Sequence, residues 1–77
     1  MRVNVALNGH LSWYTPTRER LQEVEVPEGS TVSDLITHLG VPEVEVAFAT
    51  VDEGRVDADF VLADGNTVSL VPIIAGG

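Results

Sequence analysis

The 77-residue chain contains no cysteine and no lysine. It also has no apolar run near the ~20 residues that a membrane-spanning helix requires. Without cysteine there is no disulfide and no thiolate ligand for a metal. The amino-terminal stretch MRVNVALNG lacks the apolar core of a signal peptide. These absences predict a cytoplasmic protein that does not insert into a membrane.

Positive charge is scarce. The formal net charge is −8, and the only basic side chains apart from histidine are Arg2, Arg18, Arg20 and Arg55. Binding to nucleic acid phosphates or anionic lipids needs clusters of basic residues, so neither is an expected partner. Two interpretations of the acidity remain open: it keeps a small protein soluble, or it attracts a protein partner with a basic face.

What the chain does contain is typical of one small globular domain. Hydrophobic residues make up 44% of the sequence, which argues against disorder. A chain of this size buries only about 60% of its unfolded surface, so its core is small. We expect a single domain over residues 1–77, with a flexible carboxy-terminal tail from about residue 73.

Alternation of apolar and polar residues predicts strands over 2–8 and 21–26, with Val24 and Val26 facing the core. Between them, residues 9–20 are expected to form a long loop, with a helical turn that begins at Thr15-Pro16.

Later in the chain, residues 44–51 and 67–73 are also predicted to be strands, and a short return strand is expected around Arg55-Val56. Because Pro72 cannot donate a hydrogen bond, pairing should weaken there and let the chain leave the sheet.

One amphipathic helix is predicted between the second and third strands. Its apolar stripe, with the spacing i, i+3, i+4, i+7, consists of Val32, Leu35, Ile36 and Leu39. Thr31 and Asp34 have the spacing of a capping box, with Asp in place of Glu. Gly40 is expected to cap the carboxyl end, and Pro42 prevents the helix from continuing.

Residues 57–63 are predicted to be irregular, with Phe60 and Leu62 packed into the core, and residues 64–66 to form a turn. The order of elements is then strand, strand, helix, strand, short strand, strand. One helix must cover one face of one sheet, and the first and last strands can be neighbours only at its centre. This predicts an α+β fold of the β-grasp (ubiquitin-like) type, with a mixed sheet of four to five strands packed on one main helix.

The sequence does not predict an enzyme. The serines of the chain are Ser12, Ser30, Ser33 and Ser69, and its histidines are His10 and His38. None of these serines has a histidine at a suggestive spacing. His38 is expected in the last helical turn, where a cation offsets the helix dipole, and His10 in an exposed loop. There is no phosphate-binding loop and no metal-ligand spacing, so no bound cofactor or metal is expected.

The chain ends in the segment VPIIAGG, residues 71–77. If it projects from the sheet after Pro72, Gly76 and Gly77 would allow another protein to thread it through a narrow channel. The reactive group at its end would be the α-carboxylate of Gly77, which needs activation, for example as an acyl-adenylate. A frayed and inert end is the alternative interpretation.

Four stretches resemble the MoaD/ThiS family of β-grasp sulfur carriers, which includes the small subunit of molybdopterin synthase. They are VEVPEGSTVSDLITHLG (24–40), VDEGRVDADFVLADGNTVSLVP (51–72), PIIAGG (72–77) and, more weakly, VNVALNGHLSWY (3–14). The long loop at 9–20 differs from compact thiamine-type carriers, and the residues before Gly-Gly differ from the Pro-Val-Ser often seen in molybdopterin carriers.

The resemblance implies a carrier or co-substrate rather than an enzyme. A ubiquitin-activating-like enzyme would use ATP and magnesium to adenylate Gly77, and a sulfur donor would convert it to a thiocarboxylate for cofactor synthesis, above all of molybdopterin or tungstopterin. Gly76 would permit threading. The partner-binding segment would comprise Pro72, Ile73, Ile74, Ala75, Gly76 and Gly77, and a large subunit of the molybdopterin-synthase type would enclose it.

Two other functions stay open. The same carboxylate could join the protein to lysines of other proteins, as in a ubiquitin-like modifier, or the domain could be an interaction module with an inert tail. In the long loop, Trp13 and Tyr14 either form an exposed patch for a partner or fold back over the open end of the core. Of these two arrangements, folding back is the one we expect.

Overall fold

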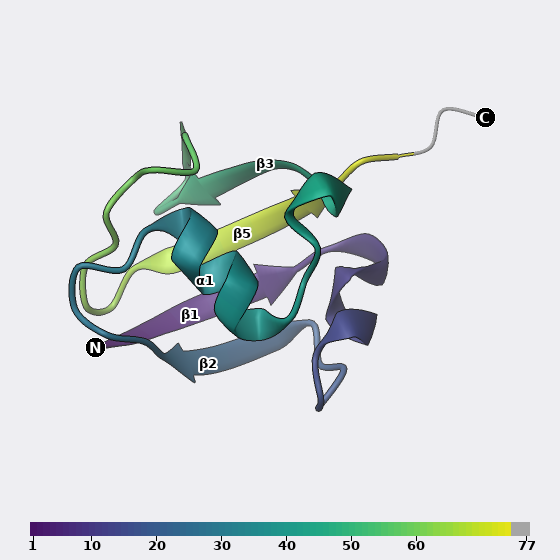
Figure 1. The fold of residues 1–77 in the computed structure, drawn as a ribbon, viewed down its shortest axis with the longest axis horizontal. Helices are drawn as coiled ribbons and strands as arrows, with labels where there is room; N and C mark the ends of the chain where they lie inside the picture. The colour runs from purple at the N-terminus through teal and green to yellow at the C-terminus, as the bar shows by residue number, and fades with distance from the viewer. Residues whose placement is uncertain (75–77) are drawn as a thin grey trace.

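The computed structural model describes residues 1–74, which form one mixed sheet with a helix across one of its faces (Figure 1). The strands are β1 (Arg2–Leu7), β2 (Leu21–Glu25), β3 (Val46–Val51), β4 (Gly54–Val56) and β5 (Thr67–Pro72). The helix α1 spans Val32–Leu39. There are also two 3₁₀ helices: η1 (Gly9–Tyr14) follows β1, and η2 (Glu43–Glu45) precedes β3.

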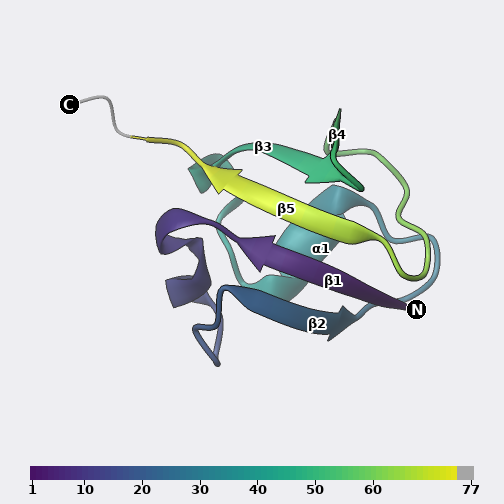
Figure 2. The same ribbon diagram turned by 180° about the vertical axis from the view of Figure 1, so that it is seen from behind.

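The strand order is β2-β1-β5-β3-β4. β1 and β5 are parallel neighbours at the centre, while the β1–β2 and β3–β4 hairpins extend the sheet outward with antiparallel pairing. β5 is antiparallel to β3. The predicted β-grasp fold is therefore confirmed, with five strands. A view from behind shows the face of the sheet opposite α1 (Figure 2).

The core lies between α1 and the sheet, because alternate residues of the strands point to the same face. Val3, Val5 and Leu7 of β1 are buried, as are Val68 and Leu70 of β5. The stripe predicted for the helix is buried throughout: Val32, Leu35, Ile36 and Leu39. Val24 and Val26 are buried as well, which confirms the predicted face of the second strand.

The predicted ends of α1 are also confirmed. The Thr31 hydroxyl accepts a hydrogen bond from the Asp34 backbone N–H at 3.1 Å, and the Asp34 carboxylate accepts one from the Thr31 N–H at 2.9 Å. At the other end Gly40 has a φ of 80°, the left-handed conformation that glycine adopts most readily. Among residues 1–74, no helix has the length and apolarity needed to cross a membrane.

Two predictions about the connections are wrong in their boundaries. The helical turn expected from Thr15-Pro16 instead lies ahead of it, as η1, and ends where the Thr15 N–H and hydroxyl both donate to the Ser12 carbonyl. The third strand begins at Val46 rather than at residue 44, because Pro42 starts a 3₁₀ turn in which its carbonyl accepts from the Glu45 N–H.

The segment between β4 and β5 is anchored differently from the prediction. Leu62 is buried as expected, but Phe60 is 40% exposed and is not a core residue. The backbone of this segment contacts the helix instead. The Phe60 carbonyl accepts a hydrogen bond from the Val32 N–H, and the Ala58 carbonyl accepts one from the Ser33 N–H. These bonds satisfy first-turn donors of α1 that have no partner within the helix.

Candidate functional site

The candidate site lies where β5 ends and the carboxy-terminal segment begins. The last strand ends at Pro72, one residue before the predicted end at residue 73. Pro72 still pairs with Val46, and the Ile73 N–H donates to the Glu45 carbonyl at 2.9 Å. Ile73 is 50% exposed and Ile74 82%. Residues 75–77, which carry the predicted functional glycines Gly76 and Gly77 and also Ala75, lie outside the described residues.

The start of η1 packs directly against the end of β5. Gly9 has a φ of +57°, and a Cβ atom at this position would lie 2.8 Å from Cγ of Pro72. The Asn8 side-chain NH₂ group donates to the Ser69 hydroxyl at 2.8 Å and to the Leu70 carbonyl at 2.9 Å. The first loop is therefore fastened to the strand that leads into the carboxy-terminal segment.

Glu45 of η2 connects the segment to the first loop from the other side. Its backbone carbonyl holds Ile73, and its carboxylate accepts a hydrogen bond from the Tyr14 hydroxyl at 3.2 Å. Partial desolvation of the hydroxyl, together with this carboxylate, raises the pKa of Tyr14 above its ordinary value of 10.0. The shift favours the protonated hydroxyl, which is the form that donates to Glu45. His10 makes an edge contact with the Tyr14 ring, at a centroid distance of 5.9 Å.

The two 3₁₀ helices η1 and η2 and the end of β5 lie at the same end of the molecule (Figures 1 and 2). Several large apolar side chains of these segments are exposed. We call them the exit surface: Trp13, Tyr14, Val44, Ile73 and Ile74. Exposed aromatic and branched side chains near one functional segment are typical of protein interaction sites. The exit surface is therefore a candidate docking surface.

The expectation that Trp13 and Tyr14 fold back over the core is wrong. Trp13 is 72% exposed and Tyr14 40% exposed, while the neighbouring Leu11 fills the core position. In η1 the buried residues are Leu11 and Ser12, so the next two side chains point away from the core.

Replacing Trp13 with alanine is expected to change the free energy of unfolding by less than about 0.5 kcal/mol, because an exposed side chain makes few contacts that are lost. Urea unfolding followed by circular dichroism measures this change. The buried neighbour provides the matched comparison: Leu11→Ala should cost about 2–5 kcal/mol. A Trp13→Ala protein as unstable as Leu11→Ala would contradict the exposed placement.

Side chains with catalytic potential are not brought together in the part of the chain that the structure describes. His10 and His38 lie on different elements and both are exposed, His38 in the last turn of α1 as predicted. The Ser30 hydroxyl donates a hydrogen bond to the Pro27 carbonyl just ahead of the helix, so it has a structural role there. Within residues 1–74, no group of three or more acidic or histidine side chains is placed to hold a metal ion.

Sequence reasoning found the carboxy-terminal segment but missed the residues that fasten its base. The sequence predicts only that Asn8 ends a strand, that Gly9 begins a loop and that Glu45 lies in a strand. A signal was present for Gly9, because a glycine that ends a clean alternating strand often marks a positive φ or a close approach. Nothing in the sequence paired it with Pro72.

These observations define the class of protein: a small ubiquitin-like β-grasp domain whose last strand runs into a segment at one end of the sheet. A family model described as Mut7-C ubiquitin matches residues 1–76, and the chain belongs to this family. A search among curated proteins finds no match.

Solved structures with the same fold include a putative molybdopterin converting factor subunit 1 from Pyrococcus furiosus, at 23% identity over 96% of this chain and 99% of that one, with a TM-score of 0.73. Small archaeal modifier protein 1 from H. volcanii is 17% identical over 95% of this chain and 98% of that one, with a TM-score of 0.75.

A third structure is a complex of subunits 1 and 2 of molybdopterin-converting factor from Helicobacter pylori. One of its chains is 24% identical, the match covers 100% of both chains, and the TM-score is 0.63. At these identities the likeness concerns the fold. Together with the ubiquitin-like family model, it confirms the resemblance of this sequence to the ubiquitin-like MoaD/ThiS family.

Proposed function

We propose that this protein is a sulfur carrier that acts through the α-carboxylate of Gly77, in a chain that ends at this residue. The observation that carries the proposal is the course of β5: the strand ends at Pro72, and the exposed residues Ile73 and Ile74 lead toward Gly76-Gly77. Glycines at 76 and 77 carry no side chain that would obstruct a narrow channel. In this proposal the protein is a co-substrate and not an enzyme.

The chemistry needs two steps on the partner enzyme. In the first, the Gly77 carboxylate attacks the α-phosphorus of ATP and releases pyrophosphate, which gives an acyl-adenylate. In the second, hydrosulfide supplied by a sulfur donor attacks the acyl carbon, the bond from this carbon to the phosphate oxygen breaks and AMP leaves, and loss of the S–H proton gives the thiocarboxylate. ATP and its magnesium ion belong to the activating enzyme, and this chain supplies the carboxylate.

The exit surface would contact the partner while the segment reaches into its active site. We infer two successive partners of different kinds, an adenylating enzyme of the ubiquitin-activating type and a large subunit of the molybdopterin-synthase type that accepts the sulfur. The name of the Helicobacter pylori structure, a complex of subunits 1 and 2 of molybdopterin-converting factor, supports the second partner. The sulfur would then enter molybdopterin or tungstopterin synthesis.

Intact-protein mass spectrometry tests the proposal directly. The protein ending at Gly77 is incubated with ATP, magnesium, a sulfide source and the host's activating enzyme. We expect a mass increase equal to the replacement of one oxygen by one sulfur, and no increase in a variant that lacks Gly77. A variant lacking Met1 instead provides a control of equal length. An unchanged mass, with the activating enzyme shown to be active on another carrier, would contradict the proposal.

The fold of small archaeal modifier protein 1 favours a second candidate, conjugation to other proteins through the same carboxylate. An amine would then attack the acyl-adenylate, or a thioester formed from it, and an amide would result. Since the chain has no lysine, it cannot build lysine-linked chains on itself. In the same experiment, this function would appear as higher-mass conjugates that depend on Gly77.

A further inference from the structure

On the β3 side of the molecule, the sheet and the helix separate and leave a cavity. The β3–β4 ladder pairs only Val51 with Gly54, Thr50 with Arg55 and Ala49 with Val56. After Val56 the chain turns away from β3 to the beginning of α1, where the Ala58 carbonyl accepts the Ser33 N–H at 2.9 Å. The first half of β3, residues 46–48, is therefore left without a neighbour on this side among the described residues.

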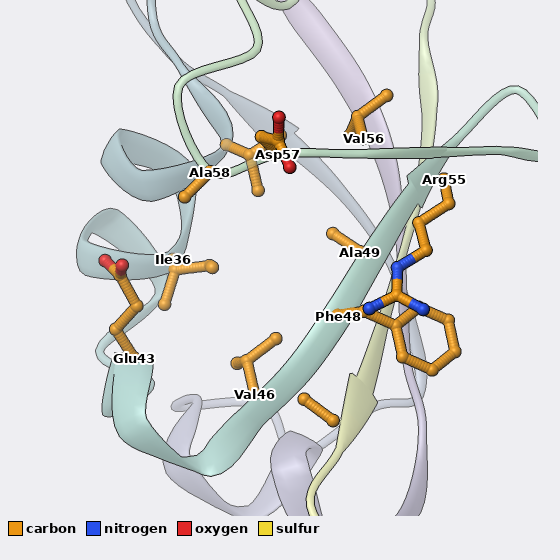
Figure 3. A pocket seen from close by; sticks show the side chains of 11 residues that line it. Ile36, Glu43, Val46, Phe48, Ala49, Arg55, Val56, Asp57 and Ala58 are labelled. Atoms are coloured by element: carbon orange, nitrogen blue, oxygen red, sulfur yellow. The ribbon is translucent and has the colours of Figure 1, made fainter.

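The opening, which we call the wedge, has a volume of about 220 Å³. Its apolar walls come from α1, β3, β4 and the chain after β4: Ile36, Val46, Ala49, Val56 and Ala58 (Figure 3). Val32 of α1 also lines the opening. Small-molecule sites usually measure about 300–1,000 Å³, so the wedge is too small for a typical cofactor. It is large enough for a branched apolar side chain supplied by another protein.

Two carboxylates stand at the rim. Glu43 lies near the Val46 end of the opening and Asp57 at the opposite end, near Val56 (Figure 3). Glu43 is held in place by the Ser33 hydroxyl, which donates to its carboxylate at 2.6 Å. The one basic residue of the lining, Arg55, is turned away: its guanidinium lies 4.6 Å from the Phe48 ring centroid. The rim thus presents negative charge at both ends of an apolar floor.

We propose that the wedge binds an extended segment of a partner protein that carries a branched apolar side chain between two basic ones. The backbone of the segment would add to the open edge of β3 at residues 46–48, a recognised mode of peptide binding. Side chains two apart on a strand share a face, so the apolar side chain would enter the wedge while its basic neighbours reach Glu43 and Asp57.

The open edge also limits the length of what can bind. The register of the β3–β5 ladder shifts between Val46 and Phe48, and such irregularities bend an edge strand and discourage long, flat pairing. A segment of a few residues fits this edge, whereas continuous extension of the sheet does not. This inference is independent of the proposed sulfur chemistry, because no wedge residue belongs to the exit surface.

The probe is an acetylated peptide amide of sequence Thr-Lys-Thr-Ile-Thr-Lys-Thr, which places Lys, Ile and Lys on one face of a strand. It is titrated into the ¹⁵N-labelled protein at low ionic strength and followed by NMR. We expect the largest shifts in the amides of residues 46–48, and weaker binding as salt is added. A peptide with Glu in place of both Lys residues should bind at least about tenfold more weakly.

Variants of the protein locate the site. Ala58→Leu fills the wedge at an exposed position and should weaken binding about tenfold or more, because the isoleucine loses its burial site. Ala63→Leu, at an exposed position outside the wedge, is the matched control. Glu43→Gln with Asp57→Asn should weaken binding about fivefold, whereas Glu19→Gln with Glu28→Gln should have little effect. Unchanged dispersion of the NMR spectrum verifies that each variant is folded.

The proposal would be overturned by no binding of the probe, by shifts centred away from residues 46–48, or by equal affinity in Ala58→Leu and Ala63→Leu. A spectrum in which these amides shift on dilution without peptide would mean that a second copy of the chain occupies the wedge, and would also overturn it.

Discussion

Replacing Leu70 with alanine is expected to destabilise the molecule by about 3–5 kcal/mol, because the lost side chain leaves a cavity that the rigid surroundings fill only in part. Leu70 is 0% exposed and lies on β5, the strand that pairs with both β1 and β3. A domain of this size has a total stability of roughly 4–12 kcal/mol. Much of its stability therefore depends on one side chain at the centre of the sheet.

Urea unfolding monitored by circular dichroism measures the effect, with Leu21→Ala as the matched control. Leu21 is also in a strand, but it lies on the edge strand β2 and is 74% exposed, so its truncation should cost well under 1 kcal/mol. Equal losses at the two positions would mean that the core is not organised around β5. A large loss at Leu70 also sets a condition on functional experiments, since variants near it must be verified as folded.

Part of the buried core can be predicted from the local sequence. Val3, Val5 and Leu7 alternate with polar residues, and this spacing alone fixes which face of β1 is buried. The capping box of Thr31 and Asp34 is likewise written within four consecutive residues. The topology follows from one further constraint, that a single helix must cover a single sheet.

Other features were not predictable because they depend on contacts between distant segments. Phe60 is a large apolar residue of the kind expected in a core. Its backbone carbonyl, however, accepts a hydrogen bond at the amino end of α1, and this position leaves the ring 40% exposed. Trp13 follows a buried leucine within a 3₁₀ turn, and the turn geometry rather than its apolarity decides its direction. Apolar character predicts burial only on average, and short segments with a backbone task are the exceptions.

The candidate site also has features that the sequence predicts and features that only the fold reveals. That the chain ends in an apolar segment and two glycines is visible in the sequence, whereas the fastening of its base by Asn8, Gly9 and Glu45 requires the fold. The wedge could not be predicted from the sequence either. It forms because the chain, after pairing with β3 as far as Val56, turns away to reach the helix. Each of these features joins parts of the chain that lie far apart in sequence.

Gly9→Ala is expected to lower the stability by about 2–5 kcal/mol, the second large effect. A left-handed backbone costs a non-glycine residue about 1–2 kcal/mol, and the added methyl group would press on the Pro72 ring, for which overpacking costs of about 1–3 kcal/mol are typical. The Cβ atom would lie 2.8 Å from Cγ of Pro72. Because the proline ring cannot swing aside, η1 or the end of β5 must move.

Gly29→Ala separates the two contributions. Gly29 also has a positive φ, +85°, but a Cβ atom there would have nothing within 4 Å, so only the backbone cost of about 1–2 kcal/mol is expected. The difference between the two variants in urea unfolding measures the packing of Gly9 on Pro72. Similar losses would contradict a close contact at the base of the carboxy-terminal segment. If the loss at Gly9 is larger, amide shifts of Ile73 and Ile74 should accompany it, because the strain falls on the residues that direct the segment out of the sheet.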